Sequence, residues 1–368
     1  MDPRINKLAY NLVNISLKIK EKEHVLIHAI GNDTVDMARA LVKEVYKVGA
    51  YPHVELLNRS VSRELMMGYT EEQLKVMEEY QLNQMKMMDA YIGVSSTDNM
   101  YELSDVPADK MNMSNRILNS VLRERVDNTK WVILRWPNGS SAQSAKMSKE
   151  SYEDYFFDVC CLDYDKMSKA MKPLVELMNK TDKVHITGEG TDLTFSIKGL
   201  PAIECSGQCN IPDGEIYTAP VKDSVNGYIT YNTPSLEDGF VYENIFFRFE
   251  NGKIVEATAN NNEKINELLD TDEGARYIGE FAIGVNPYVT RPMLDTLFDE
   301  KIAGSFHLTP GCAYEDADNG NFSAVHWDLV CIQSDEHPGK IYFDDVLIRE
   351  NGRFVHEDLL GLNPENLK

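Results

Sequence analysis

The first half of the chain alternates short apolar runs with longer segments that repeat apolar residues at helical spacing, and this alternation limits the fold most strongly. The apolar runs, which we interpret as buried strands, are His24–Ile30, Tyr51–Leu57, Asp89–Val94 and Lys130–Arg135. The segments with helical spacing are Thr34–Val48, Thr70–Met87 and Lys110–Arg125. Strand and helix in this order predict a mostly parallel sheet with helices on both faces.

The pattern changes to alternation with period two after residue 180. Lys183–Gly188 and Asp192–Ile197 flank a glycine-containing turn, as the strands of a hairpin do, and similar pieces occur at Val241–Phe249 and Ile341–Ile348. This part of the chain is therefore predicted to be α+β and largely antiparallel. One helix is expected to interrupt it, with Asp272 as the N-cap and Gly284 near its end.

A chain of 368 residues is long enough for two domains. Residues 163–178 are expected to form a connecting helix, with Pro173 as a kink or break inside it. We therefore predict an α/β N-terminal domain over residues 1–180 and a largely antiparallel α+β domain over residues 181–368.

Composition excludes several classes of protein. The formal net charge of -22 leaves no basic stripe that could neutralise phosphates, so a nucleic-acid partner is not expected. The start of the sequence does not have the pattern of a secretory signal, and no run approaches the length of apolar residues that a membrane helix requires, so we expect no membrane association. Six cysteines in a chain of this size do not make a disulfide framework, and a reducing cytoplasm is the expected compartment.

A histidine and an aspartate stand two residues apart in the run Ser323–Val330. In an extended strand His326 and Asp328 would point to one side, while Trp327 and its apolar neighbours would point to the other. Burying an imidazole beside a carboxylate is costly unless something pairs with both, and a divalent cation is such a partner. An edge strand whose His and Asp face water explains the pattern equally well.

Three further segments each supply one candidate ligand. Glu280 is the single charge in the apolar segment Tyr277–Val285, where it fits either a metal or a salt bridge to Arg276. Glu215 follows a tight Pro-Asp-Gly turn, although an acid in this position is most often solvated. His307 precedes a Pro-Gly turn and fits a hydrogen-bonded structural role as well as a ligand.

Together these segments supply two glutamates, two histidines and one aspartate, all in the second half of the chain. Carboxylates that can bridge, with imidazoles at the ends, are the ligands that a pair of borderline divalent metals uses. Neither the H-E-x-x-H motif of one zinc peptidase class nor a G-x-S-x-G nucleophile motif is present.

In several separate blocks the sequence resembles the M29 metallopeptidases, the group of aminopeptidase T and aminopeptidase S. The resemblance covers nearly the whole chain. The blocks that carry it are Ser141–Ser148, Asn210–Pro220, Gly279-Glu280, His307 with Tyr314 seven residues later, and Asn321–Asp328.

The resemblance implies an aminopeptidase that removes N-terminal residues from peptides with a metal-activated water. It implies two divalent ions per chain, zinc, cobalt or manganese, and a homodimer whose active sites face an internal cavity. Tyr314 would be the catalytic tyrosine, and Glu280 would bridge the metals or transfer a proton. The metal ligands implied by the resemblance are Glu215, Glu280, His307, His326 and Asp328.

Two other functions remain open at this point. His307, His326 and Asp328 form a two-histidine, one-carboxylate set like that of mononuclear iron oxygenases, which would leave Glu215 and Glu280 without a role. A binding protein with two lobes that close on a solute would show no turnover. The number of metal ions per chain separates the oxygenase from the hydrolase.

Overall fold

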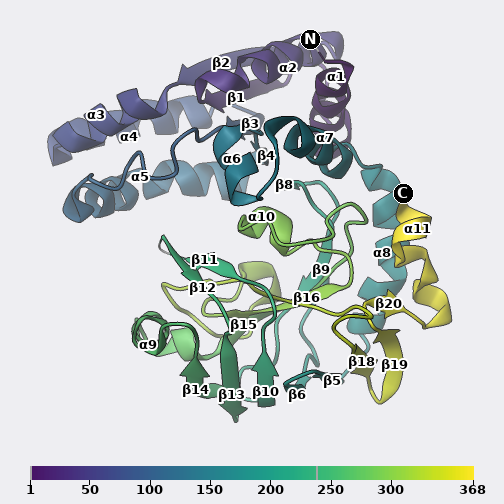
Figure 1. Cartoon of the computed structure of the whole chain (residues 1–368). Helices are drawn as coiled ribbons and strands as arrows, with labels where there is room; N and C mark the ends of the chain where they lie inside the picture. The colour runs from purple at the N-terminus through teal and green to yellow at the C-terminus, as the bar shows by residue number, and fades with distance from the viewer. Residues whose placement is uncertain (1, 238) are drawn as a thin grey trace. The chain divides into compact units, whose positions relative to one another are not determined.

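A computed structural model describes residues 2–237 and 239–368, and the chain divides into two units. The first unit comprises the chain up to Cys161 together with Gly207–Ile211, and the second comprises Leu162–Ser206 and Pro212–Lys368 (Figure 1). The predicted helix at residues 163–178 is α8 (Tyr164–Met178), which begins at the N-cap Asp163 and belongs to the second unit.

Five parallel strands form the sheet of the first unit, in the order β2-β1-β3-β4-β8. Their bounds are β1 His24–Ile30, β2 Tyr51–Leu57, β3 Ala90–Ser95, β4 Lys130–Arg135 and β8 Asn210–Ile211. Every residue of β3 from Ala90 to Val94 is buried, so both faces of the central sheet are covered, as the alternation predicted. The edge strand β2 is mostly exposed, which corrects the expectation that all four apolar runs are buried. Among the described residues it pairs with one strand, β1.

Helices fill the connections of this sheet. The three predicted helices are α2 (Val35–Lys47), α4 (Glu71–Met85) and α5 (Ala108–Asn128), each within a few residues of the expected bounds. The sequence patterns did not reveal the others: α1 (Pro3–Tyr10), a π-helical continuation (Asn11–Ser16), α3 (Arg59–Gly68), α6 (Gly139–Ser144) and α7 (Lys149–Cys160). No helix in the described part of the chain is both long and apolar enough to cross a bilayer.

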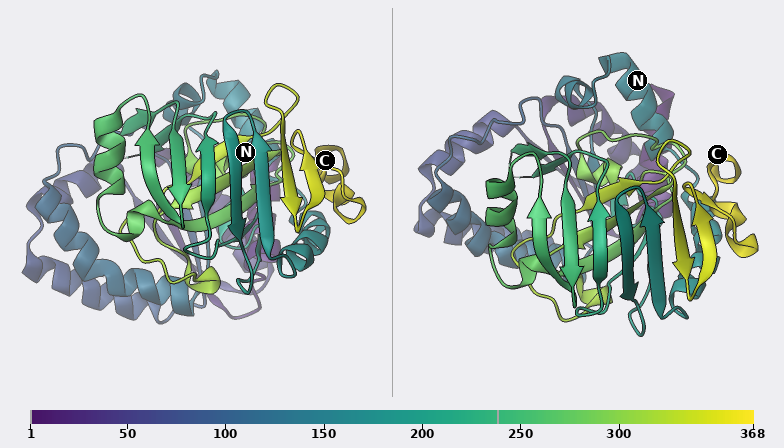
Figure 2. Two further views of the ribbon diagram at one scale, coloured as in Figure 1. Left: turned by 90° about the horizontal axis from the view of Figure 1, so that it is seen from below. Right: turned by 60° about the horizontal axis from the view of Figure 1, so that its bottom comes forward.

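Two antiparallel sheets dominate the second unit, as expected. The larger has the order β14-β13-β10-β6-β5-β18-β19-β20 and is seen face on in Figure 2. Its strands are β5 (Lys183–Gly188), β6 (Thr191–Ser196), β10 (Asn226–Thr230), β13 (Phe246–Glu250), β14 (Lys253–Thr258), β18 (Gly339–Phe343), β19 (Val346–Glu350) and β20 (Arg353–Phe354). The predicted β5–β6 and β18–β19 hairpins are both present in this sheet.

The smaller sheet has the order β17-β16-β15-β9-β7. Its strands are β7 (Ile203–Cys205), β9 (Glu215–Thr218), β15 (Ile278–Gly284), β16 (Ser305–Pro310) and β17 (Leu329–Ile332). Phe195 of β6 and Phe281 of β15 pack edge to face with ring centroids 5.0 Å apart, so side chains of the two sheets meet in the core between them.

The remaining elements of the second unit are short. Strands β11 (Ser235–Glu237) and β12 (Phe240–Tyr242) pair with each other. The helices are α9 (Asn262–Leu269), α10 (Thr296–Asp299) and α11 (Pro364–Leu367), and 3₁₀ turns occupy Gly274–Arg276, Glu315–Ala317 and Glu357–Leu362.

The prediction of a helix between Asp272 and Gly284 is wrong, because Glu280 lies on the central strand β15. All seven residues of β15 are buried, and a short run buried on both faces has no period that separates a strand from a buried helix. A Cβ on Gly279 would lie 2.4 Å from the carbonyl oxygen of Gly311, so this glycine allows close approach of two backbone segments. The N-cap of the 3₁₀ turn is Glu273, and Asp272 lies one residue before it, where it accepts a hydrogen bond from the amide of Ala275.

Candidate metal centre

Three adjacent strands of the smaller sheet place Glu215, Glu280 and His307 on one face. Glu215 begins β9, and the register pairs Ala282 of β15 with both Tyr217 of β9 and His307 of β16. Because side chains alternate along a strand, Glu215, Glu280 and His307 point to the side opposite Phe281, which faces the larger sheet. All three side chains are buried.

The loop after β16 brings the other two candidate ligands to this face. His326 bridges Gly311 in an isolated antiparallel pair, whereas β17 begins only at Leu329. The expected continuous strand over residues 323–330 is therefore wrong, because the pair lies in irregular backbone just before β17. The buried Asn321 holds the loop in place, donating to the carbonyl oxygens of Gly274 at 2.9 Å and Gly311 at 2.6 Å.

Glu280 lies between the two histidines. Its Oε1 is 3.3 Å from Nε2 of His307, and its Oε2 is 3.4 Å from Nε2 of His326. Nε2 of His326 is also 3.4 Å from Oδ1 of Asp328, and Nε2 of His307 is 3.6 Å from Oε2 of Glu215. All five residues expected from the sequence thus form one carboxylate–imidazole cluster. The alternative salt bridge from Glu280 to Arg276 is not formed, since Arg276 pairs with Asp270.

Hydrogen bonds to residues outside the set of five orient His326 and Asp328. Nδ1 of His326 lies 2.8 Å from the carbonyl oxygen of Cys312, which can only accept, so Nδ1 carries a proton and Nε2 faces the cluster. The hydroxyl of Thr309 donates to Oδ1 of Asp328 at 2.6 Å. Tyr314 lies beside His326, with ring centroids 4.6 Å apart, and the residue is 47% exposed.

The pKa values in the metal-free cluster follow from mutual attraction of its charges. Burial alone would raise the pKa of Glu280, but the adjacent imidazoles of His307 and His326 hold this pKa at about 2. Burial would lower the pKa values of the two imidazoles, but the neighbouring carboxylates raise them to about 9 for His307 and about 10 for His326. Burial raises the pKa of Glu215, an effect that Lys301 and His307 oppose. Partial desolvation and the carboxylates of Glu280 and Asp328 raise the pKa of Tyr314.

The cluster fits divalent cations. Oε2 of Glu215 and Nε2 of His326 are buried and have no hydrogen-bond partner among the described residues. The ligand-type atoms of Glu280, His307 and Asp328 lie close enough together to hold one ion, and so do those of Glu215, Glu300 and His307. Carboxylates and imidazoles at this spacing, the latter losing a proton when they bind metal, suit zinc, cobalt or manganese.

Two charged residues of the cluster were not among those expected. Lys301, which follows α10, is 1% exposed and lies with its Nζ 2.6 Å from Oε1 of Glu215 and 2.6 Å from Oε1 of Glu300. The sequence signal for them is a short run of charges, Asp299-Glu300-Lys301, which is more often a solvated surface. Only the fold shows that it is buried.

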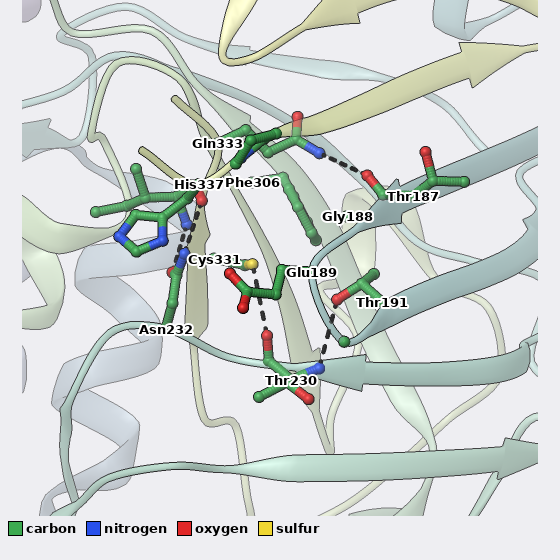
Figure 3. Close-up of a pocket in the computed structure, with 13 residues that line it drawn as sticks. Thr187, Gly188, Glu189, Thr191, Thr230, Asn232, Phe306, Cys331, Gln333 and His337 are labelled. Carbon is green, nitrogen blue, oxygen red and sulfur yellow. Dashed lines mark hydrogen bonds between the residues drawn. The ribbon is translucent and has the colours of Figure 1, made fainter. Parts of the chain in front are cut away.

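A separate cavity of about 380 Å³ lies near the same strands but not at the cluster (Figure 3). Phe306 and Cys331 line it, and because Phe306 is adjacent to His307 on β16, it points to the other face of the sheet. Glu189 and His337 lie at this cavity as well. The cavity therefore does not contain the five candidate ligands.

Comparison with known families gives one match along nearly the whole chain. The family model described as thermophilic metalloprotease (M29) matches residues 1–354. Aminopeptidase T of Thermus thermophilus is 31% identical over 222 residues, which are 52% of this chain and 54% of that protein. Aminopeptidase AmpS of Bacillus subtilis is 38% identical over 145 residues, 36% of this chain and 35% of the relative. In these two alignments the chain spans about half or less of the relatives' length.

Other comparisons extend over whole chains. Aminopeptidase PepS of Streptococcus thermophilus is 25% identical over 95% of this chain and 98% of its own. The solved structure of wild-type AmpT from Thermus thermophilus superposes with a TM-score of 0.81 at 25% identity, covering 96% of this chain and 99% of that one. A 2,5-dihydroxypyridine dioxygenase from Pseudomonas putida KT2440 has the same fold, with a TM-score of 0.65 at 12% identity over 96% of this chain and 98% of its own. The last likeness concerns the fold alone.

Proposed function

Because the chain belongs to the M29 family of metallopeptidases, we propose that it is an aminopeptidase whose catalytic centre is the carboxylate–imidazole cluster. The observation that carries the proposal is the position of Glu280, with one carboxylate oxygen directed at each of the two histidines. A carboxylate in this position can bridge two cations, each of which then has an imidazole of its own.

The proposed centre holds two divalent ions. Glu215 and His307 would hold one ion, His326 and Asp328 would hold the other, and Glu280 would be shared. The buried Oε2 of Glu215 and Nε2 of His326, which have no hydrogen-bond partner among the described residues, support this assignment. Both oxygens of Glu280 face imidazoles, so a bridging role suits it better than proton transfer.

When bound, such ions would lower the pKa of a water molecule to about 7 and polarise the scissile carbonyl. Tyr314 would supply a hydrogen bond to the oxyanion that develops there. Its raised pKa supports this role, because the phenol keeps its proton at neutral pH and remains a donor. Thr309 would keep Asp328 in position through the hydroxyl hydrogen bond between them.

Hydrolysis of L-leucine p-nitroanilide, with and without a chelator, tests the proposal. We expect protein purified without chelators to contain two divalent ions per chain and to release p-nitroaniline, chelation to abolish this activity, and readdition of zinc, cobalt or manganese to restore it. Glu280→Gln should lose metal and activity together, while Glu243→Gln, an exposed change outside the cluster, should retain both. Full activity after complete removal of metal would contradict the proposal.

The number of metal ions per chain also distinguishes the proposed aminopeptidase from a mononuclear oxygenase. The oxygenase would use His307, His326 and Asp328 as its ligands. It leaves Glu215 and Glu280 without a role, although both lie within 3.6 Å of His307. One iron per chain would favour the oxygenase, and two ions per chain would favour the hydrolase.

We further propose peptide substrates, a homodimer and a cytoplasmic location. The substrates and the dimer follow from the family, and the exposed apolar residues Val54, Leu56 and Leu57 of the edge strand β2 offer surface for an association. All six cysteines are free thiols, which suits a reducing compartment. Light scattering of the protein as it elutes from a size-exclusion column gives the molar mass. The mass of a monomer at micromolar concentration would contradict the dimer.

A further inference from the structure

A buried lysine lies at the candidate centre and has no part in the chemistry described so far. The ammonium of Lys301 lies 2.6 Å from Oε1 of Glu215, 2.6 Å from Oε1 of Glu300 and 3.9 Å from Oδ1 of Asp213. The backbone of Lys301 is also fixed, since its carbonyl accepts a hydrogen bond from the amide of Asn286 at 3.0 Å. The lysine is therefore a fixed internal cation between two carboxylates.

Glu300 is a potential extra ligand for the centre. One of its oxygens lies close enough to ligand atoms of Glu215 and His307 that the three could share an ion. Its carboxylate is buried, so without a positive partner it would be driven either to protonate or to bind a cation. Lys301 is the positive partner that Glu300 has in the structure.

We propose that Lys301 is a positioning residue that keeps Glu300 out of the metal centre and restricts Glu215 to one oxygen as a ligand. The ammonium donates a hydrogen bond to Oε1 of Glu215. Oε2 of Glu215 has no hydrogen-bond partner among the described residues and lies 3.6 Å from Nε2 of His307. This inference rests on the proposed function, because it concerns the metals of that same centre.

The consequence is an open coordination position at the ion held by Glu215 and His307. A catalytic metal needs such a position for water or substrate, whereas an ion surrounded by protein ligands is a structural one. With Glu300 and a second oxygen of Glu215 both available, the ion would have two more protein ligands. Lys301 prevents the binding of these two extra ligands, because its buried ammonium pairs with both carboxylates and is covalently fixed in the site.

The test compares four proteins with the wild type: Lys301→Met, Glu300→Gln, the double variant Lys301→Met with Glu300→Gln, and the control Lys340→Met. Lys340 pairs with Glu350 at 3.0 Å on a partly exposed hairpin. The measurements are zinc affinity, by competition with a chromophoric chelator, and the visible absorption spectrum of each protein loaded with cobalt(II). Intensity of the cobalt bands falls as the number of ligands rises.

Lys301→Met should bind its tighter zinc ion at least tenfold more strongly and show weaker cobalt bands, since Glu300 joins the ion. Glu300→Gln and Lys340→Met should have cobalt spectra like that of the wild type. The double variant should have bands weaker than those of the wild type but stronger than those of Lys301→Met, because only the second oxygen of Glu215 is released. An unchanged spectrum for folded Lys301→Met, or weaker metal binding, would overturn the inference. If Lys301→Met does not fold, a changed spectrum in Glu300→Gln or a wild-type spectrum in the double variant would overturn it, and weaker cobalt bands in the double variant alone would support it.

These results separate this inference from the proposed function. A wild type that binds no divalent metal refutes the proposed function itself. A wild type that binds two ions, together with a Lys301→Met variant of unchanged affinity and spectrum, refutes only the role of Lys301.

Discussion

The hydroxyl of Thr309 donates a 2.6 Å hydrogen bond to Oδ1 of Asp328, and both side chains lie on the metal-binding side of the smaller sheet. Thr309 is fully buried, and its register partner is Glu280. The hydrogen bond thus connects the central strands of the sheet to the last candidate ligand, which lies in irregular backbone.

Replacing Thr309 by valine tests this connection. Valine has nearly the same shape but no hydroxyl, so Asp328 would lose a partner that orients it. We expect the affinity for metal to fall by about 10- to 100-fold, as is usual when a hydrogen bond to a metal ligand is removed. Metal titration against a chelator measures the effect. Thr309→Ser, which keeps the hydroxyl, should bind metal nearly as the wild type does; an equal loss in both variants would argue against the hydrogen bond as the cause.

Tyr314→Phe should separate catalysis from metal binding. The phenol is expected to act only on the developing oxyanion, and removing one such donor lowers kcat by about 100- to 1,000-fold. Metal content should stay unchanged, because no metal ligand is removed. The measurements are kcat on an aminoacyl p-nitroanilide and metal analysis of the same sample. Tyr228→Phe, at a partly exposed tyrosine on β10, is the matched control. A normal kcat in Tyr314→Phe would exclude the proposed role.

Gly279→Ala should destabilise the second unit. The new Cβ would lie 2.4 Å from the carbonyl oxygen of Gly311 and 2.5 Å from the carbonyl carbon of Cys312, so backbone must move. We expect a loss of about 1–3 kcal/mol in the free energy of unfolding, together with weaker metal binding at the adjacent Glu280. Denaturant unfolding gives the first quantity. Gly68→Ala is the control, because nothing lies within 4 Å of its new Cβ; equal stability changes in both variants would contradict the steric argument.

Asp299 makes stability depend on pH. Burial raises the pKa of this carboxyl from 3.8 to about 7 in the folded chain. A group with a raised folded pKa contributes stability that is complete below its unfolded pKa of 3.8 and is lost as the pH rises through about 7. The loss is on the order of 4 kcal/mol.

Asp299→Asn should remove this loss, since asparagine stays neutral. Its Oδ1 can still accept the hydrogen bond that the amide of Met293 donates to Oδ1 of Asp299 at 2.6 Å. The variant should therefore differ little from the wild type at pH 4. As the pH rises to 8, its Tm in thermal unfolding of the metal-free protein should rise progressively above that of the wild type. Asp345→Asn, with a side chain 77% exposed, is the control. A variant that is less stable than the wild type at pH 8 would refute the assignment.

The fold of the first unit could be predicted because its local patterns are distinct. The runs His24–Ile30 and Lys130–Arg135 are the strands β1 and β4 with the same bounds. Glu280 was placed in a helix instead of a strand because the segment around it is apolar on both faces, and burial on both faces removes the alternation that identifies a strand. What identifies β15 is its pairing with β9 and β16, which are distant in the sequence.

The candidate ligands could be predicted from the sequence, but their supporting residues could not. Residue type and the family resemblance were enough to select His307 and Asp328. Lys301 and Thr309 carry no such signal: a lysine within a charged run and a threonine in an apolar strand are ordinary until the fold buries them beside carboxylates. Supporting contacts depend on tertiary packing, which no local pattern encodes.

The five candidate ligands come from β9, β15, β16 and the loop before β17, which are far apart in the sequence. Closing such long loops is slow and must precede any contact between the ligands, so the complete cluster can form only late in folding. An ion that needs the complete cluster therefore binds to the native state and not to partly folded states. Metal concentration should accordingly act on the lifetime of the folded chain, stabilising it by RT ln(1 + [L]/Kd) for each ion, and shortage of metal should favour its degradation.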